Sequence, residues 1–266
     1  MRTISLAAGT VLDVGPVEAV DVAADAGFTS VGIWFDAATW TDAVADGVLA
    51  RATHHGLSIL DVEPIMLMPA GSAAADSGEA IVDAAMRIGA RNILVASRDT
   101  DDGRVAARLQ ALAERLDGSG IRLVLEFLPI LGVRTLPQAL AIVTAADHPC
   151  LGVLVDNLHL SRAGHVPADL ASVDAHLLPY LQICDAPAVP ADTAHSALMH
   201  EALLGRLLPG EGGLPIAELL GVVPTVPLSL ELRSQPLRTM YPDPVERARA
   251  VRLPMERVVT TRSPKS

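Results

Sequence analysis

The chain has 266 residues, and 50% of them are hydrophobic, which is enough to bury one sizeable core. A formal net charge of −11 disfavours a nucleic-acid partner, because such binding depends on neutralising phosphates with Lys and Arg, but it permits a cation site. No run approaches the roughly 18 apolar residues of a membrane span, and two cysteines, Cys150 and Cys184, indicate no disulfide framework, so we expect a cytoplasmic protein.

Short strand-like runs alternate with helical stretches along the chain. The first run begins after Arg2, and because Asp13 interrupts its apolar stretch early, we interpret it as a strand and not as a signal peptide. Apolar residues at three- and four-residue spacing predict helices such as 17–26, 79–88, 105–116 and 136–145. Eight strands are predicted, at residues 3–6, 30–35, 58–64, 92–96, 122–127, 152–156, 180–184 and 228–232.

Strands that alternate with helices indicate parallel β-α-β units. Eight such units in a chain close to the roughly 250 residues of a TIM barrel predict a single-domain (β/α)₈ TIM barrel over residues 1–259, followed by a tail at 260–266. The alternative is an open doubly wound sheet, but no glycine-rich phosphate turn follows the first strand. The long connection 186–215, with a helix predicted near 195–206, is typical of a lid.

Four polar residues lie near the carboxyl ends of the fifth to eighth predicted strands: Glu126, Asp156, Gln182 and Glu231. Three of them have apolar neighbours on both sides, and strand side chains alternate between faces, so we expect the polar side chains to point into the barrel. Buried carboxylates are costly unless they pair or bind metal, and this end of the barrel holds TIM-barrel active sites. The pattern predicts one divalent metal ion bound by all four; the alternative is that each acid caps a helix or pairs with an arginine.

The order of these residues resembles that of the xylose isomerase-like TIM barrels, the group of sugar phosphate isomerases and epimerases. That pattern has Glu on strand five, Asp followed three residues later by His on strand six, His or Gln on strand seven, and Glu on strand eight. This chain supplies Glu126, Asp156 with His159, Gln182 and Glu231. The resemblance implies that the two glutamates are metal ligands and also catalytic acid/base groups, and that the metal is Mn, Mg, Co or Zn.

Gln182 departs from the histidine found in many members of the group. With Gln182, the four ligands form an all-oxygen set of three carboxylates and one amide. Such a set suits Mn²⁺ or Mg²⁺ better than Zn²⁺, which favours nitrogen and sulfur ligands. We therefore expect Mn²⁺ or Mg²⁺, with Co²⁺ and Zn²⁺ as the alternatives.

The expected chemistry is removal of a proton next to a carbonyl group. A metal chelated by adjacent carbonyl and hydroxyl oxygens would stabilise an enediolate, and a carboxylate can serve as the base. One base that returns the proton to the neighbouring carbon gives isomerisation, two bases on opposite faces give epimerisation, and a leaving group at the next carbon gives elimination. The sequence does not choose among these outcomes.

Four further residues are candidates for substrate binding, each with a structural alternative. His159 follows the sixth strand, and the resemblance favours a contact to a substrate oxygen over an ordinary loop histidine. Arg206 lies in segment 200–215, which also resembles one branch of the group; it binds a substrate hydroxyl or phosphate, or forms a salt bridge with Glu211. Trp34, which clusters with Phe35 and Trp40 after the second predicted strand, offers with them a sugar-stacking wall, or the three pack in the core or at the rim. Glu63 ends the third predicted strand and lines the pocket or pairs.

Two arginines, Arg233 and Arg238, follow the eighth strand and are the best candidates for binding a phosphate group, with an exposed surface as the alternative. The expected partner is a small carbohydrate-like molecule, without nucleic acid or membrane. A homo-oligomer stays open.

The first functional hypothesis is a metal-dependent isomerase or epimerase of a sugar, sugar phosphate or polyol ketone. The second is a lyase or dehydratase on the same scaffold, acting on a keto-cyclitol, a 3-keto glycoside or a dehydroshikimate-like acid. The third is a catalytically weak binding subunit, which the retention of both glutamates argues against. A DNA-repair nuclease of the same fold would need extra histidines after strands two to four, where this chain has Trp34, Phe35, Glu63, Ser97 and Arg98.

Overall fold

The computed structural model describes residues 2–72 and 78–260 of the chain. The strands in this part are β1 (Ile4–Leu6), β2 (Ser30–Trp34), β3 (Ser58–Leu67), β4 (Asn92–Ser97), β5 (Arg122–Glu126), β6 (Leu151–Asp156), β7 (Leu181–Ile183) and β8 (Leu228–Leu230). The α-helices are α1 (Pro16–Asp25), α2 (Asp42–His55), α3 (Gly78–Ile88), α4 (Asp102–Glu114), α5 (Leu136–Ala146), α6 (Asn157–Arg162), α7 (His195–Leu204), α8 (Ile216–Val222), α9 (Gln235–Met240) and α10 (Pro244–Thr260). Short 3₁₀ helices are η1 (Ala8–Thr10), η2 (Pro167–Ser172) and η3 (Ala175–Leu177).

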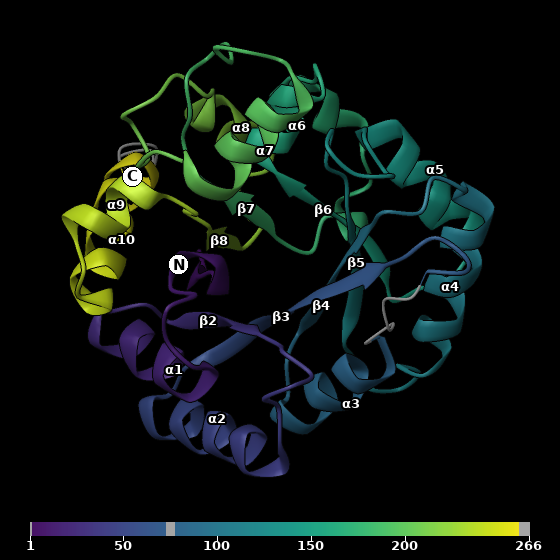
Figure 1. The fold of residues 1–266 in the computed structure, drawn as a ribbon, viewed down its shortest axis with the longest axis horizontal. Helices are drawn as coiled ribbons and strands as arrows, with labels where there is room; N and C mark the ends of the chain where they lie inside the picture. Colours follow the sequence, from purple (N-terminus) through teal and green to yellow (C-terminus); the bar gives the residue numbers. More distant parts are fainter. Residues whose placement is uncertain (1, 73–77, 261–266) are drawn as a thin grey trace.

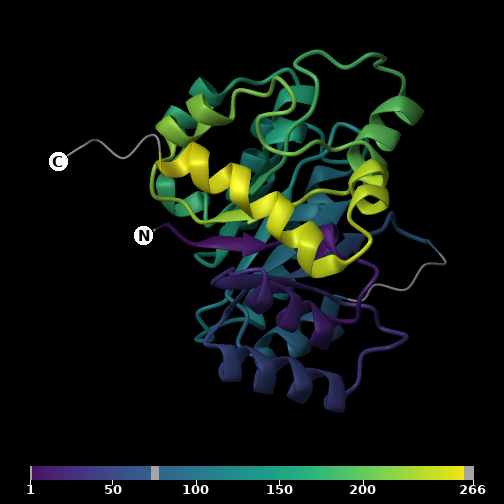
Figure 2. The same ribbon diagram turned by 90° about the vertical axis from the view of Figure 1, so that its left-hand side faces the viewer.

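All the described strands pair in parallel, in chain order, and close into one barrel surrounded by helices (Figure 1). The barrel closes where β1 pairs with β8 through Ser5 and Ser229. Helix α10 packs beside α1 on the outside of the barrel (Figure 2). The prediction of a single (β/α)₈ TIM barrel is confirmed.

Local sequence signals explain where several helices begin and end. The Thr41 hydroxyl accepts a hydrogen bond from the Val44 backbone N–H at the start of α2, and Thr135 does the same for Gln138 at the start of α5. Helix α2 ends at Gly56, which has a φ of 67° in the left-handed region that glycine adopts without steric cost. Such caps hold the helices in place against the barrel.

Two apolar layers arise from the alternation of side chains along each strand. Leu125 and Val155 face outward and belong to the large core between strands and helices. Their neighbours Val124 and Leu154 face inward and pack together with Leu60, Leu94, Ala96 and Tyr180 in a smaller core inside the barrel. The residues two positions further along β5 and β6 therefore also face the interior, at the carboxyl end of the strands.

Strand β3 is longer than predicted. The sequence prediction ended it at Pro64, because proline cannot donate a hydrogen bond to a neighbouring strand. In the structure, the pairing between β3 and β4 shifts register between Val62 and Ile65, and the strand continues to Leu67. The irregularity removes the need for a ladder hydrogen bond at the proline.

Helix α10 reaches Thr260, the first residue of the predicted tail, and residues 261–266 of that tail lie outside the described residues. Among the helices that the structure describes, none combines the length and the apolar character needed to cross a membrane.

Candidate active site

The four predicted ligands lie on consecutive strands at the carboxyl end of the barrel. Glu126 and Asp156 are the last residues of β5 and β6, Gln182 is the middle residue of β7, and Glu231 follows directly after β8. Asp156 pairs with Gln182 in the strand register, and all four side chains are buried. The sequence argument from alternating faces therefore placed them at one end of the barrel interior.

Arg206 connects two of these carboxylates. Its Nη1 donates to Asp156 Oδ2 at 2.5 Å and lies 3.0 Å from Glu231 Oε2. The guanidinium is itself buried, and it also donates to the backbone carbonyl of Ala202. The sequence prediction left two alternatives for Arg206, substrate binding from a lid helix or a salt bridge to Glu211. The structure places it after α7, and the acidic partners that it records are two of the predicted ligands, Asp156 and Glu231.

Asp156 has two structural partners besides any ligand. Its Oδ1 accepts the backbone N–H groups of Leu158 and His159, so it caps the N-terminus of α6. Burial alone would raise the pKa of Asp156, but the attraction of Arg206 outweighs it and holds the pKa below its usual value. Asp156 therefore stays ionised, and the cap places His159 on the first turn of α6.

His159 lies against Glu126. Its Nε2 is 3.9 Å from Glu126 Oε1, and burial lowers the pKa of the imidazole to about 4, so the ring is neutral near pH 7. Glu126, Asp156 and His159 each offer a ligand atom, and these atoms lie within 4.8 Å of one another. The group is the one place in the described chain where His, Cys, Asp and Glu side chains gather closely enough to hold a metal ion.

Glu126 and Asp156 differ in their charged partners. Asp156 pairs with the guanidinium of Arg206, whereas the structure records no guanidinium in contact with Glu126 among the described residues. Burial, followed by the repulsion of Glu231 and Asp156, raises the pKa of Glu126 well above its usual value. A carboxyl group with a raised pKa is suited to exchange a proton near neutral pH.

A column of polar side chains continues inward from this mouth. Gln182 Nε2 donates to Glu63 Oε2 at 3.4 Å, and burial and the neighbouring Asp61 raise the pKa of Glu63. Deeper in the barrel, the Tyr180 hydroxyl donates to Asp61 Oδ2 at 2.9 Å. Sequence reasoning identified Glu63 but missed the Asp61–Tyr180 pair, whose members lie 119 residues apart.

Residues after β1 support Glu231 from the other side. The Thr10 hydroxyl donates to the Leu230 carbonyl and accepts the Leu232 backbone N–H, each at 2.8 Å, so it clamps the backbone on both sides of Glu231. A Cβ at Gly9 would lie 2.4 Å from Glu231 Oε1, which leaves no room for a side chain there. These contacts join residues that are more than 200 positions apart along the chain. They explain why position 9 is a glycine, although the sequence shows no glycine-rich phosphate turn there.

Trp34 lies at the end of β2, half-buried, with the Arg233 guanidinium 5.2 Å from the centre of its ring. Phe35 is buried in the large core between strands and helices and packs against Trp40, with ring centres 5.1 Å apart. The three aromatic residues that are close in sequence therefore do not form one wall, and Trp34 is the member that lies near the acidic residues through Arg233.

The long β7–β8 connection is held by side chains that the sequence argument did not use for chemistry. Both oxygens of the Asp185 carboxylate accept backbone N–H groups of the loop that follows α7, at Gly210, Gly212 and Leu214. Glu201, on α7, pairs with Arg162 of α6 through two hydrogen bonds of 2.7 Å. Segment 200–215 is thereby fastened over the mouth, which places Arg206 among the acids.

The residues present fit a divalent cation. Four buried carboxylates at the mouth (Glu63, Glu126, Asp156, Glu231) face two guanidinium groups, those of Arg206 and Arg233, among the charged contacts that the structure describes. Gln182 Oε1 is buried and has no hydrogen-bond partner in the described part of the chain. Carboxyl groups that outnumber the nearby guanidinium groups, together with an unpaired amide oxygen, are what a hard cation with oxygen ligands can satisfy.

Comparisons with known proteins agree with this picture of the fold. A model of the family described as "Xylose isomerase-like TIM barrel" matches residues 20–251. A curated 3-dehydroshikimate dehydratase of Pseudomonas putida is 27% identical over 167 residues, which is 59% of this chain and 26% of that protein. The chain thus spans about a quarter of that relative's length.

Two solved structures show the same fold. The IolI protein, solved with a bound zinc atom, superposes with a TM-score of 0.83 over 100% of both chains at 16% identity. A D-psicose 3-epimerase, solved in the presence of D-fructose, superposes with a TM-score of 0.73 at 15% identity, covering 97% of this chain and 99% of the epimerase. At these identities the likeness establishes the fold.

Proposed function

This chain belongs to the xylose isomerase-like TIM barrel family, and from that premise we propose that it is a metal-dependent enzyme that removes a proton next to a carbonyl group of a small, carbohydrate-derived substrate. The observation that carries the proposal is the convergence of Glu126, Asp156 and His159, with Glu231 joined to Asp156 through Arg206. A buried cluster of acids at the carboxyl end of a TIM barrel is where the active sites of this architecture lie.

Glu126, Asp156, Gln182 and Glu231 are the proposed ligands of one divalent ion, Mn²⁺ or Mg²⁺ first and Co²⁺ or Zn²⁺ as alternatives. His159 joins them as a candidate, because its ring nitrogen lies with the Glu126 and Asp156 oxygens. An ion bound there would polarise the substrate carbonyl and favour the charge that develops as the neighbouring proton leaves. The unpaired Gln182 Oε1 supports the amide as a ligand.

Glu126 and Glu231 are the proposed proton-transfer groups. Glu126 has the raised pKa and lacks a recorded guanidinium partner, so it can hold or release a proton without breaking a salt bridge. Glu231 is held by Arg206 on one oxygen and approached by Arg233 on the other, at 3.6 Å, so its carboxylate is fixed in orientation. Arg206, Trp34 and Glu63 then border the substrate.

Elimination of water is the outcome that we favour, because two curated proteins to which this chain is similar are named 3-dehydroshikimate dehydratase. In that reaction the base takes the proton from the carbon beside the carbonyl. The electron pair of the broken C–H bond forms a C=C bond, and the C–O bond at the next carbon breaks. The departing hydroxide takes a proton from an acid and leaves as water. Isomerisation or epimerisation is the second candidate, because two glutamates from different strands reach one site.

A substrate panel in D₂O separates these outcomes. Hydroxy ketones with and without a hydroxyl at the second carbon from the carbonyl are incubated with the full chain and Mn²⁺, and NMR follows deuterium uptake and products. An alkene product, with or without deuterium uptake into the remaining substrate, identifies a lyase, and uptake with rearranged or inverted product identifies an isomerase or epimerase. Neither product formation nor deuterium uptake with any member of the panel, in protein shown to contain metal, would overturn the proposal.

A further inference from the structure

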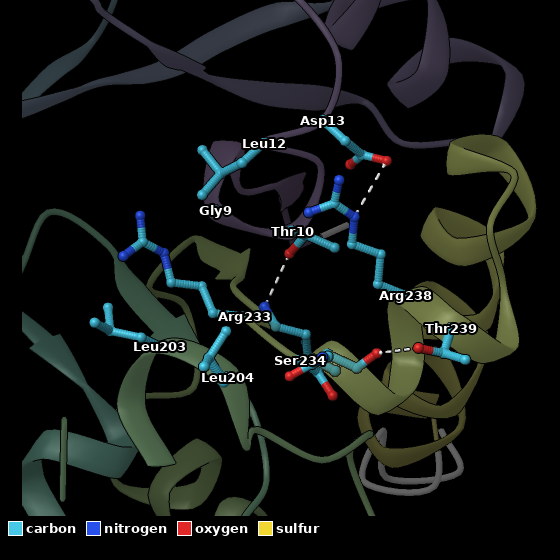
Figure 3. A pocket seen from close by; sticks show the side chains of 12 residues that line it. Gly9, Thr10, Leu12, Asp13, Leu203, Leu204, Arg233, Ser234, Arg238 and Thr239 are labelled. Atoms are coloured by element: carbon cyan, nitrogen blue, oxygen red, sulfur yellow. Dashed lines mark hydrogen bonds and ion pairs between the residues drawn. The ribbon is translucent and has the colours of Figure 1, made fainter. Parts of the chain in front are cut away.

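A pocket of about 540 Å³ opens beside the acidic cluster, between η1, the end of α7 and the segment that joins β8 to α9 (Figure 3). Leu12, Leu203 and Leu204 supply apolar wall, and Arg233 and Arg238 supply charge. The volume lies within the range typical of small-molecule sites.

The pocket adjoins one proposed proton-transfer group directly. Gly9 lines the pocket, and a Cβ at that position would lie 2.4 Å from Glu231 Oε1, so the pocket wall is thin there. Arg233 also lines it, and its Nε lies 3.6 Å from the same oxygen. A molecule bound in the pocket therefore has its far end within reach of Glu231.

The charge of the pocket is opposite to that of the mouth. Arg233 is stacked over Trp34, and its buried Nε makes no hydrogen bond among the described residues. Arg238 is 60% exposed and lies 3.6 Å from Asp13, toward which Figure 3 shows it directed. Asp13, however, already accepts a hydrogen bond of 2.5 Å from the buried Arg247. Asp13, the acid that the structure records beside Arg238, is thus neutralised by another cation, which leaves the Arg238 charge available to a ligand.

We propose that this pocket binds an oxyanion group of the substrate, a phosphate or a carboxylate, with Arg233 and Arg238 as its charged partners. A guanidinium presents two parallel N–H donors that match the oxygens of either group. In a chain with a net charge of −11 and an acidic mouth, two arginines without a tight acid partner at one pocket mark a site for a negative group. The inference rests on the proposed function only in calling that ligand the substrate.

The pocket then fixes the class of substrate and its direction. The anionic group is held between η1 and α9, and the carbon skeleton extends past Gly9 toward Glu231. Because Arg233 pairs with the anion while its Nε stays 3.6 Å from Glu231 Oε1, its charge offsets the repulsion between the anion and that carboxylate. The substrate is therefore an anionic hydroxy ketone, and a neutral sugar fills the site less well.

Anion binding tests the proposal without turnover. The full chain is titrated calorimetrically with inorganic phosphate and, separately, with acetate. The same titrations are made on four variants and compared with those of the unaltered chain: Arg233→Gln, Arg238→Gln, Arg51→Gln and Glu126→Gln. Arg51 lies on α2, is 52% exposed and is 3.5 Å from Asp21 of α1, so its substitution removes the same charge from a residue that does not line the pocket. We expect saturable binding of at least one anion, weakened about tenfold or more by Arg233→Gln and by Arg238→Gln and less than twofold by Arg51→Gln.

The two anions distinguish the two sources of the group: phosphate alone indicates a phosphorylated substrate, and acetate alone a carboxylate. Absence of saturable binding at millimolar concentration, or equal weakening by Arg51→Gln, overturns the proposal. Binding that Glu126→Gln abolishes and Arg238→Gln leaves intact places the anion on the metal and also overturns it. Because no step requires catalysis, an inactive enzyme that still binds anions through these arginines contradicts the proposed function and leaves the pocket in place.

Discussion

Two layers of side chains fill the interior of the barrel, and they lie only two residues apart along the same strands. The deeper layer includes Val124 and Leu154, which are fully buried and surrounded by apolar neighbours. The outer layer lies inside the barrel at the carboxyl ends of the strands. It includes Glu126 and Asp156, which are buried almost as completely but have ionisable side chains. Burial and strand face are the same in both, so neither of these properties separates a core from a site.

What separates the layers is whether the polar groups have enough partners. The deeper layer contributes stability by removing apolar surface from water, about 25 cal/mol for each Å². The outer layer holds more carboxyl groups than the nearby arginines can pair with, and burial together with neighbouring carboxylates raises the pKa of Glu126. Such an arrangement costs stability and is typical of a functional site.

The largest expected effect comes from removing a proton-transfer group in the outer layer. Glu126→Gln and Glu231→Gln keep side-chain volume and an oxygen donor but cannot act as bases. We expect each to lower turnover by roughly 10²–10⁴-fold, the usual loss for a missing acid/base group. Steady-state kinetics and deuterium exchange at the substrate carbon measure it, with metal content checked by elemental analysis.

The matched control is Glu114→Gln, because Glu114 ends α4 and is exposed. It makes the same chemical change on the surface and should leave turnover unchanged. Normal turnover with full metal in both outer-layer variants would contradict the proton-transfer assignment and make His159 the next candidate.

The next largest effect comes from the deeper layer. Leu154→Ala leaves a cavity in a fully buried position, and we expect the free energy of unfolding to fall by about 2–5 kcal/mol. Urea denaturation measures it. Leu253→Ala, at a position 46% exposed on α10, is the control and should change stability little. Equal losses in the two variants would mean that the inner core does not carry stability as argued.

The sequence predicted the deeper architecture better than the contacts at the mouth. Apolar runs bounded by Gly and Pro located all the strands, and the alternation of faces placed Glu126 and Asp156 inside the barrel. Spacing cannot reveal that Arg206 lies 50 positions from its partner Asp156, or that Thr10 clamps the backbone around Glu231 from 222 residues away. Contacts between distant segments depend on the closed fold, so only the structure supplies them.

The third prediction concerns Asp61, an acid within the inner region beside Tyr180. Burial and the charge of Glu231 raise the pKa of Asp61 to about 7, although the Tyr180 hydrogen bond opposes the rise. The pKa of an aspartate in an unfolded chain is about 3.9. Between that pH and about 7, Asp61 therefore holds a proton in the folded protein that it has released in the unfolded chain. The free energy of unfolding therefore falls as pH rises through this window, by at most about 1.4 kcal/mol for each pH unit.

Asp61→Asn removes this titration, so its stability should depend less on pH across the same window, while Glu63 and Glu126 still contribute. Urea denaturation at several pH values measures the slope. Asp99→Asn is the control, because the Arg104 hydrogen bonds lower the pKa of Asp99 to about 2, and its stabilisation is lost only as pH falls below about 4. An unchanged slope in Asp61→Asn would contradict a protonated Asp61.

The smallest expected effect is a change of metal preference at Gln182, which joins the two layers because Tyr180 lies two residues before it. Gln182 donates to Glu63 and leaves its Oε1 without a described partner, so we expect that oxygen to face the metal. Gln182→His replaces the oxygen donor with nitrogen, which Zn²⁺ and Co²⁺ favour over Mn²⁺. The ratio of Zn²⁺ to Mn²⁺ affinity should rise about tenfold, equivalent to about 1.4 kcal/mol.

Competition titrations measure this ratio. The control is Gln110→His, on the exposed face of α4, which reports zinc binding by a surface histidine alone. An equal rise in both variants would show that Gln182 is not a ligand, and the metal would then depend on Glu126, Asp156 and His159.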